Sequence, residues 1–203
     1  LSAHMNNEAV ALCIENALQV EVSDRVKVIR TLMAELQRLA SHQLWWCVMG
    51  MDMGALTTFF YGLRDREIIL DIFEETCGAR LTLNYSTPGG VMFDLHPNFQ
   101  KRVKEFTKYF RKKLPEYNQL LTGNVIFKER TVGLGYLSKE EAIAYGVTGP
   151  TGRASGFACD VRKHNPYSAY DRVQFNEVLR TDGDTFGRYQ ARDRKSTRLN
   201  SSH

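Results

Sequence analysis

Apolar residues recur three and four positions apart through most of the first 121 residues, which is the spacing of helices with one buried face. This pattern predicts helices at residues 6–20, 24–50, 52–62, 65–77 and 97–121. In the first of them, the apolar face consists of Ala9, Leu12, Cys13, Ala17 and Val20. Ser23, a residue type that favours the N-cap position, precedes the second.

Turn and cap residues mark the ends of further elements. The stretch "TPGGV" at residues 87–91 predicts a turn, because it combines a proline with two glycines. Pro115 should kink or split the helix at 97–121, since proline has no amide proton to donate. Ser138 and Glu141 have the spacing of a capping box, which predicts a short helix that stops at Gly146.

Two stretches lack a helical period. Residues 123–137 place Val125, Ile126 and Phe127 side by side and predict extended, turn-rich chain. Residues 147–190 are rich in glycine, proline and aromatic residues and predict loops and short strands. We therefore expect an α+β fold that is mainly α, with a helical core at 1–146 and a partly β region at 147–192.

Composition and charge exclude several classes of protein. The chain is 43% hydrophobic and 25% charged, as in ordinary globular proteins. Half of its net charge of +4 comes from residues 193–203, and the rest of the chain is too weakly basic to indicate nucleic-acid binding. That tail has a single apolar residue and resembles a translated sequencing adapter. We expect it to be a non-native, disordered tail outside the fold.

The four cysteines, Cys13, Cys47, Cys77 and Cys159, form no C-x-x-C pair and predict reduced thiols rather than a metal site. Asp52 and the charged "LRDRE" interrupt the one candidate for a membrane-spanning segment. The chain begins with Leu1 and without a signal peptide, so we expect its N-terminus to be cut. Neither a dinucleotide-binding glycine motif nor a P-loop nor a serine-hydrolase motif is present.

One carboxylate, Asp52, stands in the most apolar stretch of the chain, residues 45–61. Burying an ionised carboxylate without a partner is costly, so its position calls for an explanation. Asp52 could be a water-facing N-cap residue at a helix boundary, because aspartate favours that position. It could instead line an apolar cavity and hold a histidine or a ligand proton there. The pattern leaves both interpretations open.

A second group of polar residues shares one face of the long helix. Glu35, Arg38 and His42 follow one another at spacings of three and four. A solvated ion pair with a structural histidine is the ordinary interpretation of such a group. Alternatively, these three residues could support a nearby binding site.

Several blocks of sequence resemble one family when they are taken together. They are "NNEAVALCIENAL", "RTLMAELQRLASH", "MDMGALTTFFYGLRDRE", "GARLTLNYSTPGGV", "DVRKHNPYSAYDRVQF" and "GDTFGRYQAR". They look like the 49-kDa-type subunit, or D subunit, of respiratory complex I, the proton-pumping NADH–quinone oxidoreductase. The resemblance extends from residue 1 to about residue 192.

The resemblance implies a fold similar to the large subunit of nickel–iron hydrogenases, with the former nickel cavity used as the quinone headgroup pocket. Asp52 matches the aspartate of the family's D-x-G-A motif, which contacts a quinone-binding histidine. It would thus be catalytic and quinone-binding. Val48 and Phe60 would flank the quinone, and Glu35, Arg38 and His42 would support the pocket from within.

The resemblance also implies the setting. The chain would bind no cofactor or metal itself. Its electrons would come from an iron–sulfur cluster in a partner subunit, and NADH would be used elsewhere in the complex. The partners would be that iron–sulfur subunit, the 30-kDa-type subunit, the membrane subunits and a quinone such as ubiquinone or menaquinone. Its place would be peripheral, on the cytoplasmic face of the bacterial inner membrane.

Two departures and two alternatives accompany this interpretation. The family's quinone-binding histidine loop and tyrosine would precede Leu1, and its C-terminal domain would follow this chain, so we expect the fragment alone to be inactive. Thr87 stands where many relatives have arginine. The chain could also belong to the large subunit of a membrane-bound nickel–iron hydrogenase-related complex, or act as a scaffold that only docks partners.

Overall fold

The computed structural model describes the backbone of residues 2–198 and the side chains of residues 2–192. The chain divides between Phe110 and Arg111 into two compact units, which are described separately. The elements of the first unit are α1 (Ala3–Leu18), α2 (Asp24–Asp52), α3 (Leu56–Cys77), β1 (Ser86–Thr87), β2 (Gly90–Val91) and most of α4 (Phe99–Tyr117).

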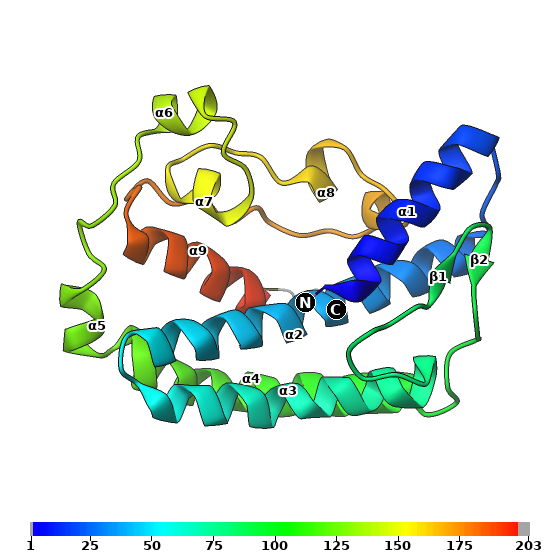
Figure 1. Cartoon of the computed structure of the whole chain (residues 1–203), viewed down its shortest axis with the longest axis horizontal. Coiled ribbons are helices and arrows are strands. Elements are labelled where there is room, and N and C mark those ends of the chain that lie inside the picture. Colours follow the sequence, from blue (N-terminus) through cyan, green and yellow to red (C-terminus); the bar gives the residue numbers. More distant parts are fainter. Residues whose placement is uncertain (1, 199–203) are drawn as a thin grey trace. The chain divides into compact units, whose positions relative to one another are not determined.

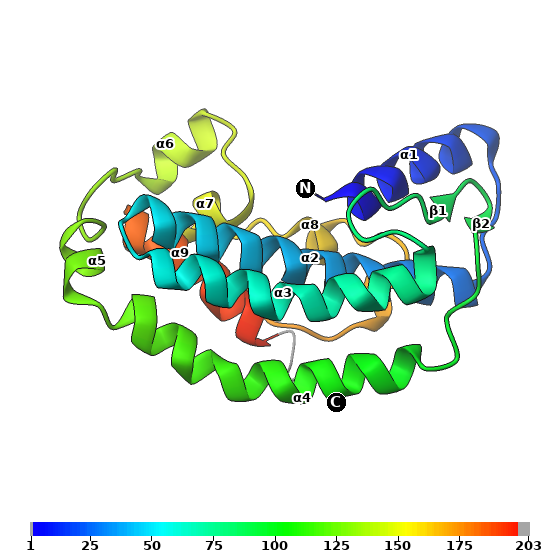
Figure 2. The same cartoon turned by 60° about the horizontal axis from the view of Figure 1, so that its bottom comes forward.

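Helices α2 and α3 form an antiparallel hairpin and run side by side along their length (Figures 1 and 2). Two glycines allow the helices to approach closely. A Cβ on Gly50 would lie 1.9 Å from Oγ1 of Thr58, and a Cβ on Gly62 would lie 2.6 Å from Cβ of Cys47. Helical spacing at residues 65–77 predicts an inward face of Ile68, Ile69, Ile72 and Phe73. The last three are fully buried, and Ile68 is half-buried.

The predicted boundary within α3 is wrong. One helix covers residues 56–77 where the pattern predicted two, at 52–62 and 65–77, and α2 continues to Asp52. Gly62, at the end of the first predicted helix, instead lies inside α3. Because α3 meets Cys47 there, the close approach of α2 explains the glycine.

Helix α1 buries the face opposite to the predicted one. Its buried residues are His4, Glu8, Ala11 and Glu15. Four of the five residues of the expected apolar face, Ala9, Cys13, Ala17 and Val20, are exposed, and Leu12 is half-buried. Apolar spacing therefore identified the helix but not the side that packs.

A buried ion pair explains this orientation of α1. Arg30 on α2 donates from Nη2 to Oε1 of Glu15 over 2.6 Å and from Nη1 to Oε2 over 3.0 Å. Both side chains are almost fully buried. The guanidinium holds the pKa of the Glu15 carboxyl below its ordinary value, chiefly through these hydrogen bonds. A helix that supplies one partner of such a pair must turn its polar face inward.

The same ion pair holds the β1–β2 hairpin. Arg30 Nη2 also donates to the carbonyls of Thr87 and Gly90, over 2.8 and 2.9 Å, and the Gly89 amide donates to Glu15 over 2.8 Å. The strands pair Ser86 with Val91 and Thr87 with Gly90, so Pro88 and Gly89 form the turn predicted at 87–91. Gly89 has φ +85°, as the second central residue of a type II turn requires.

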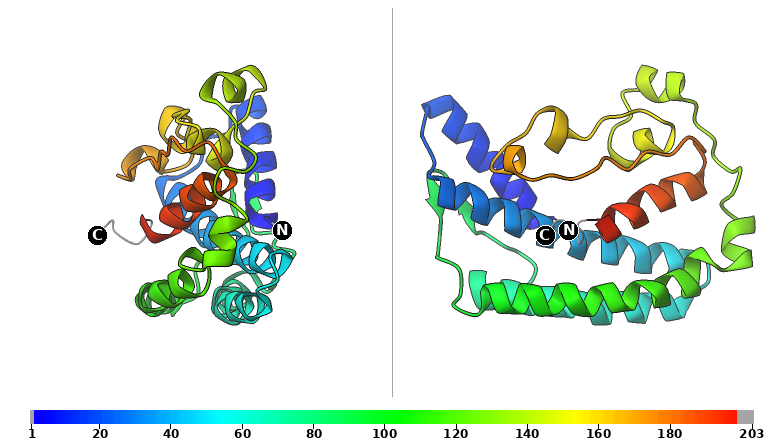
Figure 3. Two further views of the ribbon diagram at one scale, coloured as in Figure 1. Left: turned by 90° about the vertical axis from the view of Figure 1, so that its left-hand side faces the viewer. Right: turned by 180° about the vertical axis from the view of Figure 1, so that it is seen from behind.

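Helix α4 runs beside α3 (Figure 3) and buries the aromatic side chains of Phe99, Phe106 and Phe110. Within the first unit, the Tyr109 hydroxyl donates to Asp65 of α3 over 2.8 Å. Pro115 lies inside α4 and does not split it, so that part of the expectation is wrong, while a kink there stays a prediction. The helix continues to Tyr117 and then widens into a π-helical turn, η1 (Asn118–Thr122).

The second unit consists of short helices. They are α5 (Val125–Glu129), α6 (Lys139–Ala144), α7 (Gly149–Ala154), α8 (Val161–His164), the 3₁₀ turn η2 (Tyr170–Arg172) and α9 (Thr185–Arg198). The capping box at Ser138 and Glu141 is confirmed, and Gly146 has φ +64° just after α6. The extended prediction for residues 125–129 is wrong. Asn124 caps a helix there by accepting from the Phe127 amide over 3.2 Å.

Two carboxylates fix the irregular chain of the second unit. Asp184 accepts from the Gly187 amide over 2.6 Å at the start of α9 and from the Gly133 amide over 2.7 Å. Asp160 binds Arg162 through two contacts of 3.0 and 2.8 Å, and Arg153 lies 3.7 Å away. Backbone bonds between segments, such as those from the Arg180 amide to the Arg153 carbonyl and from the Gly183 amide to the Ala154 carbonyl, both over 2.9 Å, also hold these loops.

The mainly helical fold is confirmed. Within residues 2–198, the only strands are β1 and β2, so the short strands expected at 147–192 are replaced by short helices and loops. No helix in this part of the chain is both long and apolar enough to cross a membrane. Helix α9 extends to Arg198, into the tail expected to be disordered, and residues 199–203 lie outside the described residues.

Candidate functional site

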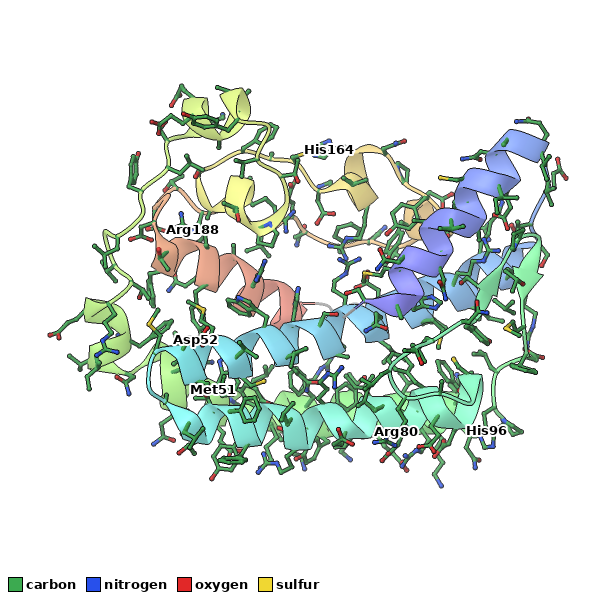
Figure 4. All side chains as sticks on the ribbon, in the orientation of Figure 1. Met51, Asp52, Arg80, His96, His164 and Arg188 are labelled. Carbon is green, nitrogen blue, oxygen red and sulfur yellow. The ribbon has the colours of Figure 1, made fainter. Side chains whose placement is uncertain are left out.

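Asp52 is the last residue of α2, at the corner where the chain turns into α3 (Figure 4). The predicted site therefore lies at one end of the α2–α3 hairpin. Arg80, which follows the C-terminus of α3, lies at the opposite end (Figure 4) and binds Glu67, Asp71 and Glu74.

The corner after Asp52 has a defined geometry. The Ala55 amide donates to the Gly50 carbonyl over 2.8 Å, and the Gly54 amide donates to the Met51 carbonyl over 2.9 Å. These two bonds form a Schellman motif, which ends a helix with a residue of positive φ. Gly54 has φ +87°, and a Cβ there would meet nothing within 4 Å. Gly54 is thus a conformational glycine, unlike Gly50, which gives the close approach.

Asp52 has no evident stabilising role at this corner. Asp52 faces water at a helix boundary, as the first interpretation expected, but the N-cap position of α3 is taken by Ala55, so the N-cap role is wrong. A carboxylate in the last turn of a helix faces the negative end of the helix dipole, which is unfavourable. Asp52 is exposed, and its side chain has neither a hydrogen bond nor an ion pair within residues 2–192. Its side chain is therefore open to groups that lie outside this chain.

Helical register places Val48 near Asp52. The two residues are four positions apart on α2, so their side chains lie on one face. Gly50 packs against α3, and a residue two positions further along a helix is turned by about 200°. Asp52 and Val48 consequently lie on the side of α2 that does not face α3. Val48 is half-buried and offers an apolar neighbour to the carboxylate.

The structure does not bring Phe60 to this surface. Thr58 and Gly62 of α3 both pack against α2, and Phe60 lies midway between them. Its side chain therefore points away from α2 and is 61% exposed. It stacks edge-on with Phe59, with ring centroids 5.9 Å apart. Asp52 and Phe60 lie on different sides of the hairpin.

The polar group on α2 lies further along the helix. Arg38 Nε donates to Glu35 Oε1 over 3.1 Å, and both side chains are largely buried. His42 is half-buried one turn later. At 1.5 Å per residue, His42 is about 15 Å and Glu35 about 25 Å from Asp52 along the axis. These three residues therefore lie too far along α2 to contact the side chain of Asp52.

Sequence reasoning missed the buried polar cluster of the first unit. His4 is fully buried on α1, with its ring 6.2 Å from that of Tyr85. Burial lowers the pKa of His4 to about 4, so its imidazole is neutral at physiological pH. Arg30 and Glu15 are 15 positions apart, a separation that carries no helical or strand signal. The available clue was that three polar residues, His4, Glu8 and Glu15, share one face of α1.

Two of the four cysteines, Cys47 and Cys77, have the chemistry of core thiols, whereas Cys13 is exposed, contrary to the expected helix face. Burial raises the pKa of Cys47, and it raises the pKa of Cys77 to about 12. A protonated thiol is a poor nucleophile and a poor metal ligand. Within the described residues, no group of three or more His, Cys, Asp or Glu side chains is placed to hold a metal ion. That the full protein binds no metal stays a prediction.

The model of the respiratory-chain NADH dehydrogenase 49 Kd subunit family matches residues 52–197. The chain belongs to this family. It is 60% identical over 192 residues to the C/D subunit of NADH-quinone oxidoreductase from Bacteroides thetaiotaomicron, and 43% identical to the D subunit from Geobacillus thermodenitrificans. These matches cover 95% of this chain, 36% of the first relative and 52% of the second.

A solved member of a respiratory complex has the same fold. One chain of the membrane-bound sulfane sulfur reductase, an archaeal respiratory membrane complex, matches with a TM-score of 0.89 and 31% identity. That match covers 92% of this chain and 50% of the other. The chain thus spans about half or less of the length of these relatives, and the family resemblance drawn from the sequence blocks is confirmed.

Proposed function

We propose that this chain is the part of a 49-kDa-type subunit that contributes Asp52 to the quinone headgroup site of a proton-pumping NADH–quinone oxidoreductase. The relatives with the higher identities are named as subunits of an NADH-quinone oxidoreductase, which supports the reaction. The single observation that carries the site is the position of Asp52. It is an exposed carboxylate at an unfavourable helix end, without a partner among residues 2–192.

The chemistry of quinone reduction suits such a carboxylate. Reducing a quinone to a quinol takes two electrons and two protons. A carboxylate beside an imidazole holds that ring in one orientation and favours its protonated form, so that the ring can pass a proton to the quinone oxygen. The imidazole would come from chain outside these 203 residues. Val48, one turn before Asp52, would provide an apolar wall for the headgroup.

The remaining components would lie in other subunits. Electrons would reach the quinone from an iron–sulfur cluster held by a partner subunit, and NADH would be oxidised elsewhere in the complex. We propose contacts with that iron–sulfur subunit, the 30-kDa-type subunit and the membrane subunits, at the cytoplasmic face of the membrane. The family and the respiratory membrane complex with the same fold support this setting.

Substitution of Asp52 in the complete enzyme tests the proposal. Asp52→Asn keeps the size of the side chain and removes its charge. We expect quinone reduction by NADH to fall at least tenfold, because a positioned proton-transfer group contributes about 10²–10⁴-fold. Electron transfer from NADH to a soluble artificial acceptor should stay at the wild-type rate, since it bypasses the quinone.

Glu21→Gln is the control for this experiment. Glu21 is an exposed carboxylate in the loop between α1 and α2, so its loss changes the net charge equally. Both activities should remain at the wild-type rate in this variant. An Asp52→Asn enzyme that reduces quinone as fast as the wild type would refute the proposed role.

A second candidate is a membrane-bound, hydrogenase-related complex with a different donor and acceptor. The match to the sulfane sulfur reductase favours this second candidate. Its sequence identity is 31%, however, against 60% for the NADH-quinone oxidoreductase relative, which favours the first. With the second candidate, the complete complex would lack NADH–quinone activity. In either case we expect the 203-residue chain alone to be inactive, since it spans about half or less of its relatives.

A further inference from the structure

Helix α4 has two chemically distinct faces. Its inner face carries Phe99, Phe106 and Phe110, which are buried. Its outer face carries cations three and four positions apart, the spacing that aligns side chains along a helix, with one exposed carboxylate, Glu105, among them. These exposed cations are Lys101, Lys104, Lys108, Arg111 and Lys112, and we call them the α4 basic face.

The α4 basic face differs from other cations of the same helix in having no anionic partner. Arg102 lies 3.2 Å from Glu75 of α3, and Lys113 lies 2.9 Å from Glu116. None of the five cations of the basic face forms an ion pair with a described residue. Their charge is thus directed outward rather than used within the fold.

The composition of this face indicates the kind of surface that it fits. Four of its five cations are lysines, and lysine is depleted in protein–protein interfaces, where arginine is enriched. A lysine ammonium is a compact point charge that suits diffuse anionic surfaces. Four to eight such cations on an amphipathic helix are typical of segments that bind anionic lipid headgroups.

We propose that the α4 basic face binds a membrane surface through anionic phospholipid headgroups. The inference rests on the proposed function, because a peripheral subunit of a respiratory complex works beside a membrane. The contact is electrostatic and superficial, since the aromatic face of α4 is already buried in the first unit. It would add to the anchoring that other subunits provide.

Vesicle binding by the full 203-residue chain tests the inference. The probes are vesicles of phosphatidylcholine alone and vesicles with phosphatidylglycerol as the anionic lipid, sedimented with the protein at low salt. We expect binding only to the anionic vesicles, with affinity falling as salt rises. Each headgroup-facing lysine contributes about fivefold, so Lys101→Gln/Lys104→Gln/Lys108→Gln should weaken binding on the order of 100-fold.

A matched control removes the same charge elsewhere. Lys128, Lys139 and Lys163 are exposed lysines on α5, α6 and α8. The triple variant Lys128→Gln/Lys139→Gln/Lys163→Gln should bind anionic vesicles within about threefold of the wild type. Circular dichroism checks folding, and if the first triple variant unfolds, the single variants Lys101→Gln and Lys108→Gln should each lose about fivefold.

The possible outcomes separate the inference from its rivals. If both triple variants lost the same vesicle affinity, net charge alone would explain the binding, and the inference about the α4 basic face would be wrong. The inference would also be wrong if the chain bound an acidic polypeptide but not anionic vesicles, because the α4 basic face would then be a protein-binding surface. Asp52→Asn should bind vesicles like the wild type, so failure of the proposed quinone site would leave this result unchanged.

Discussion

Where α2 faces α3, one glycine from each helix, Gly50 and Gly62, and a set of apolar side chains bring the helices into close contact. On the side that faces α1, the contact is made by charged groups, with Arg30 and Glu15 paired through two hydrogen bonds. Both contacts are buried, and both are specific. The first depends on shape and the second on charge.

The difference explains where hydrophobic patterns succeed and fail. A helix that packs by shape buries its apolar stripe, so spacing identified the inner residues of α3. A helix held by a buried ion pair must turn its polar side inward. In α1 this leaves Val10 and Leu18, which are 60% and 69% exposed, on the outside. Such apolar residues stay available for whatever covers them in the complete protein.

Breaking the charged contact should give the largest effect. Arg30→Met leaves the Glu15 carboxylate buried without its partner and frees the carbonyls of Thr87 and Gly90. We expect the free energy of unfolding to fall by about 3–5 kcal/mol, measured by chemical denaturation. The exposed pair Arg25–Asp94 is the control, and Arg25→Met should cost less than about 1 kcal/mol. Equal losses in the two variants would contradict the comparison.

The second-largest expected effect is a dependence of stability on pH, caused by the buried His4 of α1. In the folded protein the pKa of His4 is about 4, against 6.5 for the free side chain. Between these values the unfolded chain binds a proton that the folded chain does not. Stability is therefore full above pH 6.5 and falls as the pH drops to 4, by about 3 kcal/mol at most.

Two histidine variants separate this effect from general acid denaturation. His4→Gln should flatten the loss of stability between pH 6.5 and 4. His96→Gln, in the loop before α4, should leave it as in the wild type. Thermal unfolding measured across this range checks both, and an unchanged pH dependence in His4→Gln would exclude His4 as the cause.

The contact that depends on shape should give the smallest of the three effects. Gly62→Ala places a Cβ 2.6 Å from Cys47 Cβ and 3.2 Å from the Gln43 carbonyl oxygen. The helices must move apart, at a cost of about 1–3 kcal/mol. Gly90→Ala meets nothing within 4 Å, and we expect it to change the free energy of unfolding by less than about 0.5 kcal/mol. A neutral Gly62→Ala would mean that the close approach is not needed.

Elements of the fold that depend on local chemistry were predictable from the sequence. The capping box at Ser138, the turn at Pro88 and the long helix α2 all follow from neighbouring residues. The helix at Val125–Glu129 was missed because two β-branched residues favour a strand, while the cap at Asn124 and the contacts of Phe127 decide otherwise. Tertiary context overrides propensity in so short a segment.

The candidate site was predictable in part. The family resemblance pointed to Asp52 and its D-x-G-A motif, and the structure adds a reason for the glycine, which ends α2 with positive φ. It could not be foreseen that Phe60 turns away from α2, because that depends on the register between the two helices. The distance from Asp52 to His42 follows directly from helix geometry.

The measurement that tests the central claim most directly is photolabelling of the complete enzyme with an azide-bearing quinone. The labelled peptides would be mapped by mass spectrometry, with and without an excess of unlabelled quinone. We predict a label on the peptide that contains Val48 and Asp52, which disappears under competition. Competable label confined to other peptides, with this one unmodified, would show that the quinone binds elsewhere.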